Sequence, residues 1–356
     1  MPRHREHTES VNIWALRCAK CGRCIVDCPT YLATKWEHLS PRGRIILSFH
    51  AENDSELIKS TFSCLTCAMC EVVCPSGVEV TNLLETARKR FVEIGAVPER
   101  LSEFFGKMDR SGNPYGIDVE TYDPSGQVDI LYYPGCTSLL REREIFESSV
   151  KILKKLGVRF AIEFKYCCGS TTLRTGGSEK FARRNFERLR EIVEKTGAKR
   201  IIVSCPGCYR TIAKDYRKFG EIGAEVQHMV EFLAENAAKL GLRRENIRIA
   251  FHDSCHLARH MKVVEEPRVV LRRMGTLVEA EQHGLSSFCC GGGGGVKLSY
   301  RDISRAVRDM RVAQLKKTEA EVIITSCPYC YRNLKNSGGG LNIKDITIFI
   351  AERLKE

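Results

Sequence analysis

Residues 255–330 begin with Cys255-His256, continue with Phe288-Cys289-Cys290 and five glycines, and end with Ser326-Cys327-Pro328-Tyr329-Cys330. Five thiols in this arrangement exceed the four ligands that one tetrahedral zinc ion takes. Thiolates are soft ligands that suit iron–sulfur clusters, so the stretch predicts a metal assembly larger than a single ion. His256 adds a titratable proton carrier directly after the first cysteine.

The same cysteine pattern occurs earlier in the chain, which indicates a duplicated module. Cys136, Cys167-Cys168-Gly169 and Cys205-Pro206-Gly207-Cys208 precede their counterparts by 119, 122 and 122 residues. Short apolar runs at residues 129–133 and 247–251 end just before a cysteine, and helical stripes alternate with such runs. Strand–helix–strand order predicts α/β packing with parallel sheets. Because such sheets place ligands beyond the C-terminal ends of their strands, we expect the five thiols of each module to converge.

Eight further cysteines form two copies of a different run near the N-terminus. They are Cys18, Cys21, Cys24 and Cys28-Pro29, followed by Cys64, Cys67, Cys70 and Cys74-Pro75. This is the bacterial ferredoxin spacing, in which the first three cysteines bind one [4Fe–4S] cubane and the fourth binds the other. The spacing predicts one cubane on Cys18, Cys21, Cys24 and Cys74, and a second on Cys64, Cys67, Cys70 and Cys28. The alternatives are two zinc knuckles or a set of buried cysteines, but zinc favours pairs of pairs over triplets that end in Cys-Pro.

The domain organisation follows from these motifs and from a stretch rich in turn formers at residues 107–127. We expect a mostly helical, two-cluster ferredoxin-like domain over residues 1–107, because the long separation of Cys28 and Cys64 leaves room for helices. Two duplicated α/β modules are expected over residues 128–245 and 246–356. A chain of 356 residues forms real hydrophobic cores and does not need disulfide staples, so its 18 cysteines indicate metal or redox chemistry.

The charge pattern and the N-terminus suggest partners and location. The formal net charge is +12, but Lys and Arg are spread along helical segments that also carry Glu, so we expect no nucleic-acid partner. A positive surplus suits an acidic partner or an anionic substrate. Residues 1–7 lack the apolar core of a signal peptide, and no apolar run is long enough to cross a bilayer. We expect a cytoplasmic protein, either free or peripheral on the cytoplasmic face of a membrane complex.

With both cysteine patterns in view, the chain resembles the D-subunit family of heterodisulfide reductases, in which a two-cubane ferredoxin part is fused to two CCG domains. Iron–sulfur subunits of glycolate and lactate oxidases share this architecture. In the family each complete CCG motif binds a non-cubane [4Fe–4S] cluster through five cysteines. The resemblance implies one site at Cys136, Cys167, Cys168, Cys205 and Cys208, and a second at Cys255, Cys289, Cys290, Cys327 and Cys330. All 18 cysteines would then be metal ligands.

The resemblance implies the catalytic iron–sulfur subunit of a complex that reduces a disulfide, such as that of coenzymes M and B, to two thiols. Two electrons would arrive through the cubanes, and His256 would carry protons, unless it only supports a cluster by hydrogen bonding. Thr137 stands at the matching place of the first module. The run Gly291–Gly295 would expose one face of a cluster, form a mobile loop, or simply lead into the next helix.

The alternative function is electron transfer without disulfide chemistry. The chain would then relay electrons from a flavin-dependent 2-hydroxy-acid (glycolate or lactate) dehydrogenase or a membrane quinone complex. Because the sequence lacks a dinucleotide-binding glycine fingerprint, any flavin would be on a partner flavoprotein, whereas a membrane b-type cytochrome is the partner expected for disulfide reduction. A third interpretation, a zinc-bound scaffold, predicts a colourless protein without iron.

Overall fold

The fold is described from a computed structural model, which describes residues 15–50, 55–119 and 122–354. Residues 1–7, on which the expectation about a signal peptide partly rests, lie outside this part of the chain. The chain forms two compact units. The first comprises Met1–Phe104, Thr171–Ser178 and Phe288–Arg311, and the second comprises Phe105–Ser170, Glu179–Ser287 and Val312–Glu356. The predicted domain borders differ from this division, because short segments of both cysteine-rich modules belong to the first unit.

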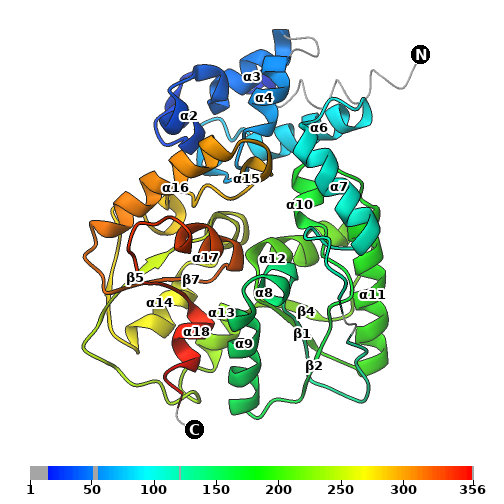
Figure 1. The fold of residues 1–356 in the computed structure, drawn as a ribbon, viewed down its shortest axis with the longest axis vertical. Helices are drawn as coiled ribbons and strands as arrows, with labels where there is room; N and C mark the ends of the chain where they lie inside the picture. Colours follow the sequence, from blue (N-terminus) through cyan, green and yellow to red (C-terminus); the bar gives the residue numbers. More distant parts are fainter. Residues whose placement is uncertain (1–14, 51–54, 120–121, 355–356) are drawn as a thin grey trace. The chain divides into compact units, whose positions relative to one another are not determined.

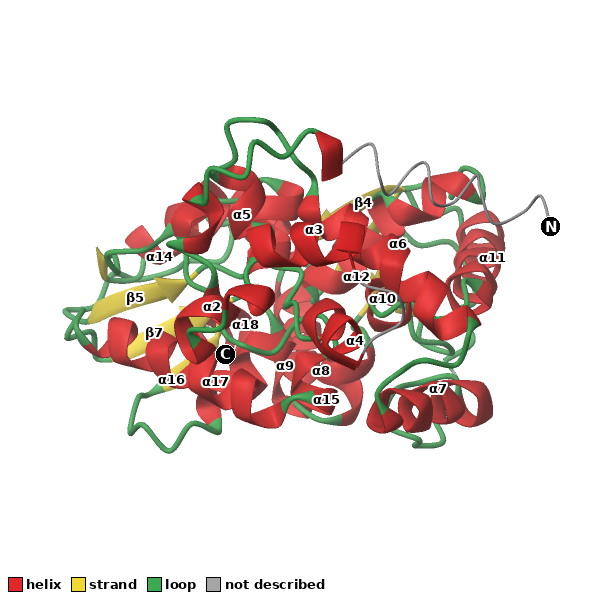
Figure 2. Ribbon diagram, turned by 90° about the horizontal axis from the view of Figure 1, so that it is seen from above, coloured by secondary structure: helices red, strands yellow, loops and turns green. Residues whose placement is uncertain are grey.

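The elements described for the first unit are helical (Figure 2), which confirms the mostly helical ferredoxin-like part. Ala15, Ile45, Val78, Leu83 and Leu84 form part of its core, and predicted ligand cysteines pack against them. The helices are η1 (Arg23–Ile25), α2 (Pro29–Thr34), η2 (Glu37–Leu39), α3 (Pro41–His50), α4 (Ser55–Phe62), α5 (Met69–Val72), α6 (Val80–Glu93) and α15 (Val296–Ser299), with α7 (Glu99–Ser111) and α16 (Arg301–Lys316) continuing into the second unit.

Helix α7 shows that the expected linker was placed too early. The turn-forming residues suggested a linker from residue 107, but α7 continues to Ser111. The reason is a buried stripe of Leu101, Phe104 and Met108 at helical spacing, which extends past residue 107. Gly112, with φ of 68°, follows the helix in a left-handed conformation that glycine adopts without strain.

The second unit contains two parallel four-stranded sheets with the same strand order, which confirms the duplicated α/β modules. Figure 1 marks β1, β2 and β4 of one sheet and β5 and β7 of the other. One sheet has the order β2-β1-β3-β4 and the other β6-β5-β7-β8. Leu131 of β1 pairs with Ala161 and Ile201, and Ile249 of β5 pairs with Leu277 and Val322. The strands are β1 (Ile130–Tyr133), β2 (Phe160–Ile162), β3 (Arg200–Val203), β4 (Glu225–His228), β5 (Arg248–His252), β6 (Thr276–Val278), β7 (Val322–Thr325) and β8 (Ile343–Asp345).

Helices of the two modules pack reciprocally. Helix α18 of the second module packs against α9 of the first, and α13 of the first packs against α14 of the second. Helix α13 corresponds to α18, and α9 corresponds to α14. The two modules are therefore related by an approximate twofold axis, here called the approximate twofold exchange. The remaining elements are α8 (Cys136–Leu140), α9 (Arg143–Lys155), α10 (Ser170–Arg174), α11 (Lys180–Thr196), α12 (Pro206–Ala213), η3 (Asp215–Lys218), α13 (Met229–Glu235), the π-helix η4 (His256–His260), α14 (Glu265–Arg272), η5 (Gly284–Ser286), α17 (Pro328–Lys335) and α18 (Ile346–Ala351).

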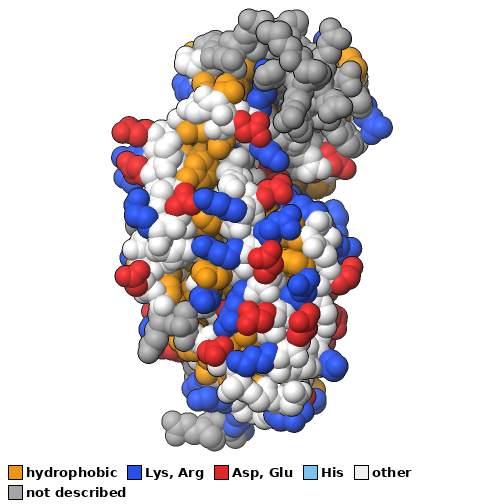
Figure 3. All heavy atoms as spheres, turned by 90° about the vertical axis from the view of Figure 1, so that its right-hand side faces the viewer, with side chains coloured by type: hydrophobic (Ala, Val, Ile, Leu, Met, Phe, Trp, Pro, Cys, Tyr) orange, Lys and Arg blue, Asp and Glu red, His pale blue; other side chains and the backbone are white. Residues whose placement is uncertain are grey.

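The surface carries charges of both signs. On the face drawn in Figure 3, Lys and Arg side chains are interspersed with Asp and Glu. Helix α11 contributes ion pairs such as Arg188 with Asp123 at 3.1 Å and Arg190 with Glu194 at 3.7 Å. Exposed pairs of this kind contribute little stability, so the fold depends on its cores.

The last helix of each module begins with a buried capping side chain. His228 caps α13, and Asp345 caps α18 at the equivalent position. The carboxylate Oδ1 of Asp345 accepts hydrogen bonds from the Thr347 amide at 2.9 Å and from its hydroxyl at 2.8 Å. Burial raises the pKa of Asp345 to about 7, because the charged form is poorly solvated there.

We predict that Asp345→Asn removes a pH-dependent loss of stability. The native state holds the Asp345 proton more tightly than the unfolded chain, so the wild-type protein loses stability as the pH rises through about 7. Asparagine keeps the cap but does not ionise. The difference in unfolding temperature between variant and wild type should therefore grow from pH 5 to pH 8, by the equivalent of roughly 3 kcal/mol. Anaerobic thermal unfolding measures it, and a difference that is constant over this range contradicts the prediction.

Candidate metal centres

Four cysteines from the two ferredoxin runs line one cavity of the first unit. Cys18, Cys21, Cys24 and Cys74 surround a space of about 390 Å³, which includes volume open to solvent. Cys21 is exposed, whereas the other three thiols are partly buried. The amide of Val78 donates a hydrogen bond of 3.4 Å to the Cys74 sulfur. We call this cavity the outer site.

The other four cysteines of these runs line a second cavity. Cys28, Cys64, Cys67 and Cys70 surround about 340 Å³, again counting open space. Cys28, Cys67 and Cys70 are buried, and Cys70 also borders the outer site. The Thr66 amide donates to the Cys64 sulfur at 3.4 Å. We call this cavity the inner site. The fold thus groups each fourth cysteine with the opposite triplet, while the role of these thiols as cluster ligands stays a prediction.

Two buried arginines accompany the inner site. Arg44 lines its cavity and is 2% exposed, and Arg88 is fully buried. Arg44 donates to Ser60 O at 2.8 Å and to the hydroxyls of Thr30 and Ser63, each at 3.1 Å. Burial raises the pKa of the Cys64 thiol, and the positive charges of Arg44 and Arg88 partly oppose this rise.

The donor chemistry of the inner site fits an iron–sulfur cluster. A buried cation needs a counter-charge, yet all hydrogen-bond acceptors found for Arg44 and Arg88 in the described residues are neutral oxygens. A cluster held by four thiolates carries a net negative charge and would supply it. The cavity lining holds four thiols and no carboxylate, and the Thr66 amide donates to the Cys64 sulfur, which suits such a cluster better than a hard cation such as Mg²⁺.

Arg88 joins three segments of the first unit. Its guanidinium donates to Thr61 O at 2.8 and 3.0 Å and to Cys64 O at 2.7 Å. The same group donates to Arg174 O at 2.7 Å and to Gly294 O at 3.0 Å. The segments containing Arg174 and Gly294 follow the Cys-Cys-Gly motifs of the first and second modules. One side chain therefore fixes the backbone next to a predicted ligand, Cys64, and the loops beyond both motifs.

The glycine run has a structural role that none of the three sequence interpretations included. A Cβ atom on Gly294 would overlap Cys64 O, and one on Gly293 would lie 2.5 Å from Leu65 O. Gly294 also has a positive φ of 58°. The glycines thus permit close packing against the loop of the inner site. The run also leads through α15 into α16, as one interpretation expected. Exposure of a cluster face by these residues stays a prediction.

The five thiols of the first module converge in the second unit. The Cys136 and Cys167 sulfurs lie 3.8 Å apart, and those of Cys168 and Cys208 lie 3.3 Å apart. Hydrogen bonds from the Cys208 and Cys327 thiols lower the pKa of Cys205. Cys136 follows β1, and Cys205 follows β3, so the thiols gather beyond the C-terminal ends of parallel strands as predicted.

Cys327, the partner of Cys205, belongs to the other module and stands at the equivalent position. The approximate twofold exchange thus brings the corresponding thiols of the two modules into contact. Cys327 also accepts a hydrogen bond of 3.4 Å from the Cys330 amide. The second module's Cys289 and Cys290 are buried in the first unit, so convergence of all five thiols of that module stays a prediction.

Histidines of the second module lie beside its cysteines. The His256 Nδ1 atom lies 3.4 Å from the Cys255 sulfur, and its ring centroid is 4.7 Å from that of His260. A ring nitrogen of His252 lies within 4.8 Å of the Cys330 sulfur. At the position equivalent to His252, the first module has Tyr133, whose hydroxyl donates to Tyr166 O at 2.7 Å. The two modules therefore differ in polar groups near their thiols.

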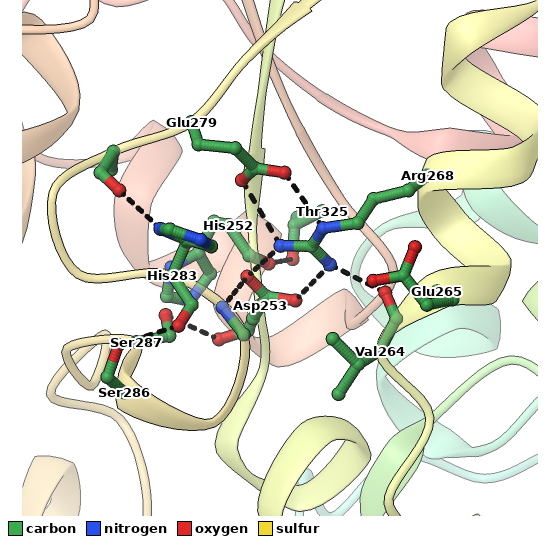
Figure 4. A network of polar contacts seen from close by, with 12 residues as sticks. His252, Asp253, Val264, Glu265, Arg268, Glu279, His283, Ser286, Ser287 and Thr325 are labelled. Atoms are coloured by element: carbon green, nitrogen blue, oxygen red, sulfur yellow. Dashed lines mark hydrogen bonds and ion pairs between the residues drawn. The ribbon is translucent and has the colours of Figure 1, made fainter.

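A buried ion-pair network supports the loop before Cys289 (Figure 4). Arg268 pairs with Asp253 and Glu279, each at 2.8 Å. Asp253 accepts a hydrogen bond of 2.7 Å from the Gly284 amide, and its carbonyl accepts one of 3.1 Å from the Ser287 hydroxyl. Asp253 stands two residues before Cys255, so the network fixes both the strand end at Cys255 and the approach to Cys289.

Sequence reasoning missed the arginines and this carboxylate. Arg88 lies at helical spacing with buried Leu84 and Phe91, and a charge on an apolar stripe was the available signal. Asp253 stands between an apolar strand and a cysteine, and this position was a weaker signal in the sequence. Arg44 had no local signal, because its acceptors are 14 to 19 residues away.

Comparisons with known proteins agree with this arrangement. Residues 130–213 and 249–335 match the Cysteine-rich domain family, and residues 14–78 match the 4Fe-4S dicluster domain family. The fold and the grouped thiols define an iron–sulfur redox protein. The D subunit of the dihydromethanophenazine:CoB–CoM heterodisulfide reductase of Methanosarcina mazei is 32% identical, over 95% of this chain and 93% of that protein. The chain belongs to the D-subunit family of heterodisulfide reductases.

Other relatives are named for different reductases. The B subunit of fumarate reductase (CoM/CoB) from Methanothermobacter marburgensis is 28% identical, over 90% of this chain and 67% of that protein. A hypothetical protein from Helicobacter pylori shares the fold, with a TM-score of 0.53 and 9% identity over 81% of this chain and 60% of that one. Across the residues that the structure describes, no helix is both long and apolar enough to cross a membrane.

We predict that Gly294→Ala destabilises the inner site more than a matched glycine substitution. The added methyl group would overlap Cys64 O, whereas a Cβ on Gly77, which also has a positive φ, meets nothing within 4 Å. Both changes cost about 1 kcal/mol in backbone strain, and only Gly294→Ala adds a clash. Iron content and thermal unfolding of anaerobically purified variants measure the effect. Equal losses for the two variants contradict the packing role.

Proposed function

We propose that this chain is the catalytic subunit of a heterodisulfide reductase-like complex. It reduces a disulfide, with two electrons and two protons, to two thiols. The names of the Methanosarcina relatives, which include CoB and CoM, support the heterodisulfide of those coenzymes as the substrate class. The formal charge of +12 favours such anionic molecules. A membrane b-type cytochrome or a flavoprotein subunit supplies the electrons.

The proposal assigns all 18 cysteines as ligands. Cys18, Cys21, Cys24 and Cys74 hold one [4Fe–4S] cubane at the outer site, and Cys28, Cys64, Cys67 and Cys70 hold a second at the inner site. Each module holds a non-cubane [4Fe–4S] cluster through its five cysteines. When bound, these clusters supply electrons one at a time. The cavities around the ferredoxin cysteines and the sulfur contacts of the first module support this assignment.

The observation that carries the disulfide chemistry is the proximity of Cys205 to Cys327, whose thiol lowers the pKa of Cys205. These residues are equivalent in the duplication and belong to the two five-cysteine sets. A disulfide has two sulfur atoms and needs two electrons, so two adjacent one-electron centres suit its cleavage. A chain that only relays electrons needs no second centre at the same place.

His256 carries a proton to a departing thiolate in this proposal. Its Nδ1 atom lies 3.4 Å from the Cys255 sulfur, and the ring is only partly buried. An imidazole changes its charge in the physiological pH range, which suits proton delivery. In the first module, the position equivalent to His256 is occupied by Thr137, whose hydroxyl is hydrogen-bonded to the Tyr115 hydroxyl at 2.9 Å. The proposed proton route therefore belongs to the second module, which has the histidine.

The second candidate is electron transfer within a flavin- or quinone-linked complex. A relative from Syntrophomonas wolfei, named EtfAB:quinone oxidoreductase, is 27% identical over 88% of this chain and 54% of that protein, and it favours this role. The two candidates share the cluster assignment and differ in whether the modules act on a substrate.

We predict that single Cys→Ala variants sort into two spectroscopic groups. Cys28→Ala and Cys67→Ala should lose the same cubane signal in electron paramagnetic resonance (EPR), because Cys28 lines the inner cavity with Cys67. Cys74→Ala and Cys21→Ala should lose the other signal. Iron content checks that each variant loses one cluster. If Cys28→Ala behaves like Cys21→Ala, ligation is not crossed and the assignment is wrong.

We predict that the anaerobic protein, with a reduced low-potential dye, converts a CoM–CoB-type heterodisulfide to thiols. His256→Asn should lower kcat by about 100-fold, because asparagine can keep a hydrogen bond to Cys255 but cannot transfer a proton. Iron content and EPR spectra should be unchanged.

Thr137→Ala is the matched control, since it changes the same place in the first module. It should keep most activity and the wild-type pH profile. A His256→Asn variant with wild-type kcat and pH profile would leave His256 only a supporting role. An iron-complete wild-type protein that does not turn over the heterodisulfide would favour the electron-transfer function.

A further inference from the structure

We infer that Arg44 and Arg88 keep the inner cluster reducible, so that it accepts electrons from the outer one. The inference rests on the ligand assignment of the proposed function and goes beyond it by naming the residues that order the two cubanes. Three observations within the first unit carry it. They are the burial of Arg44, the burial of Arg88, and the different setting of Arg42 at the outer site.

Arg44 places a positive charge at the wall of the inner cavity. Its side chain lines that cavity and is 2% exposed, and its acceptors among the described residues are neutral oxygens of Thr30, Ser60 and Ser63. Thr30 Oγ1 in turn lies 3.3 Å from the Cys28 sulfur. A buried charge with neutral partners acts on its surroundings with little screening by water. Arg44 therefore acts directly on charge at the inner site.

Arg88 adds a second positive charge behind Cys64. It is fully buried, and its guanidinium donates to the carbonyl of this predicted ligand at 2.7 Å. The Glu85 carboxylate on the same helix pairs with Arg174 at 3.2 Å. No described carboxylate forms an ion pair with Arg88. Cys64 and the Glu85 carboxylate both interact with its charge, so Glu85 compensates part of this charge while Arg88 still acts on Cys64.

The arginine at the outer site differs from Arg44 and Arg88 in its solvent exposure and in its charged partner. Arg42 lines its cavity, but this side chain is 28% exposed and pairs with Glu37 at 2.6 Å. Its charge is both compensated and screened by solvent. The Cys21 thiol is exposed, so water reaches this site directly.

These differences determine how each site tolerates an added electron. If electrons pass from the outer to the inner site, the cluster that Cys28, Cys64, Cys67 and Cys70 would hold gains one negative charge for each electron received. Water stabilises extra negative charge at the outer site, whereas burial removes that stabilisation at the inner site. The two guanidinium groups replace the missing water. Without them, the reduction potential of the inner cluster falls and transfer from the outer cluster becomes unfavourable.

EPR-monitored redox titration of the anaerobically purified full chain tests the inference without any substrate. Arg44→Gln should lower the midpoint potential of the inner cluster and leave that of the outer cluster unchanged. Arg44→Lys keeps the charge and should stay near the wild-type value. Arg42→Gln, the matched control at the outer site, should shift neither midpoint by a comparable amount.

Two results would overturn the inference in protein of full iron content. One is an inner-site midpoint that Arg44→Gln leaves unchanged, and the other is an equal shift for Arg44→Gln and Arg44→Lys. If Arg44→Gln does not fold, Arg88→Gln against Arg88→Lys provides the same comparison of charge. A wrong ligand assignment gives a different result. In that case the wild-type protein shows no EPR signal of iron that is lost in both Cys28→Ala and Cys67→Ala.

Discussion

The structure of the first unit depends on the guanidinium of Arg88 and the four carbonyl groups that it holds. These belong to Thr61, Cys64, Arg174 and Gly294, at distances of 2.7 to 3.0 Å. Carbonyl groups at chain turns would otherwise be buried without donors, which is costly. The planar guanidinium group of Arg88 donates hydrogen bonds to all four carbonyl groups. It thereby connects the Cys64 loop to the segments that follow both Cys-Cys-Gly motifs. The glycine run makes this junction possible, because a side chain at Gly294 would occupy the position of Cys64 O.

Duplication explains the second unit in the same physical terms. Two copies of one α/β module pack by reciprocal helix contacts, and such an exchange brings equivalent residues together at its axis. Cys205 and Cys327 are such a pair. The copies then differ where polar chemistry matters, with His252 against Tyr133 and His256 against Thr137. Equivalent backbones thus carry the shared thiols, while the polar side chains around these thiols differ between the two modules.

The sequence allowed prediction of what local patterns encode. Cysteine spacing predicted the grouping of Cys28 and Cys74 with opposite triplets, and short apolar runs predicted the central strands β1 and β5. Strands β2 and β6 were not predicted, because each has only three residues. Arg44 and Asp253 escaped prediction for a different reason. Their roles come from partners distant in the chain, which no local pattern records.

In the proposed ligand assignment, burial of the two arginines and binding of iron at the inner site would depend on each other. Four neighbouring thiolates would repel one another, while the two buried guanidinium groups donate to neutral oxygens and the Glu85 carboxylate compensates part of the Arg88 charge. Together, with iron between the thiolates, they compensate. Metal binding then contributes to folding, as it does where ligands come from separated parts of a chain. Because Arg88 also holds Arg174 O and Gly294 O, the order of both module segments in the first unit is coupled to the charge balance at the inner site.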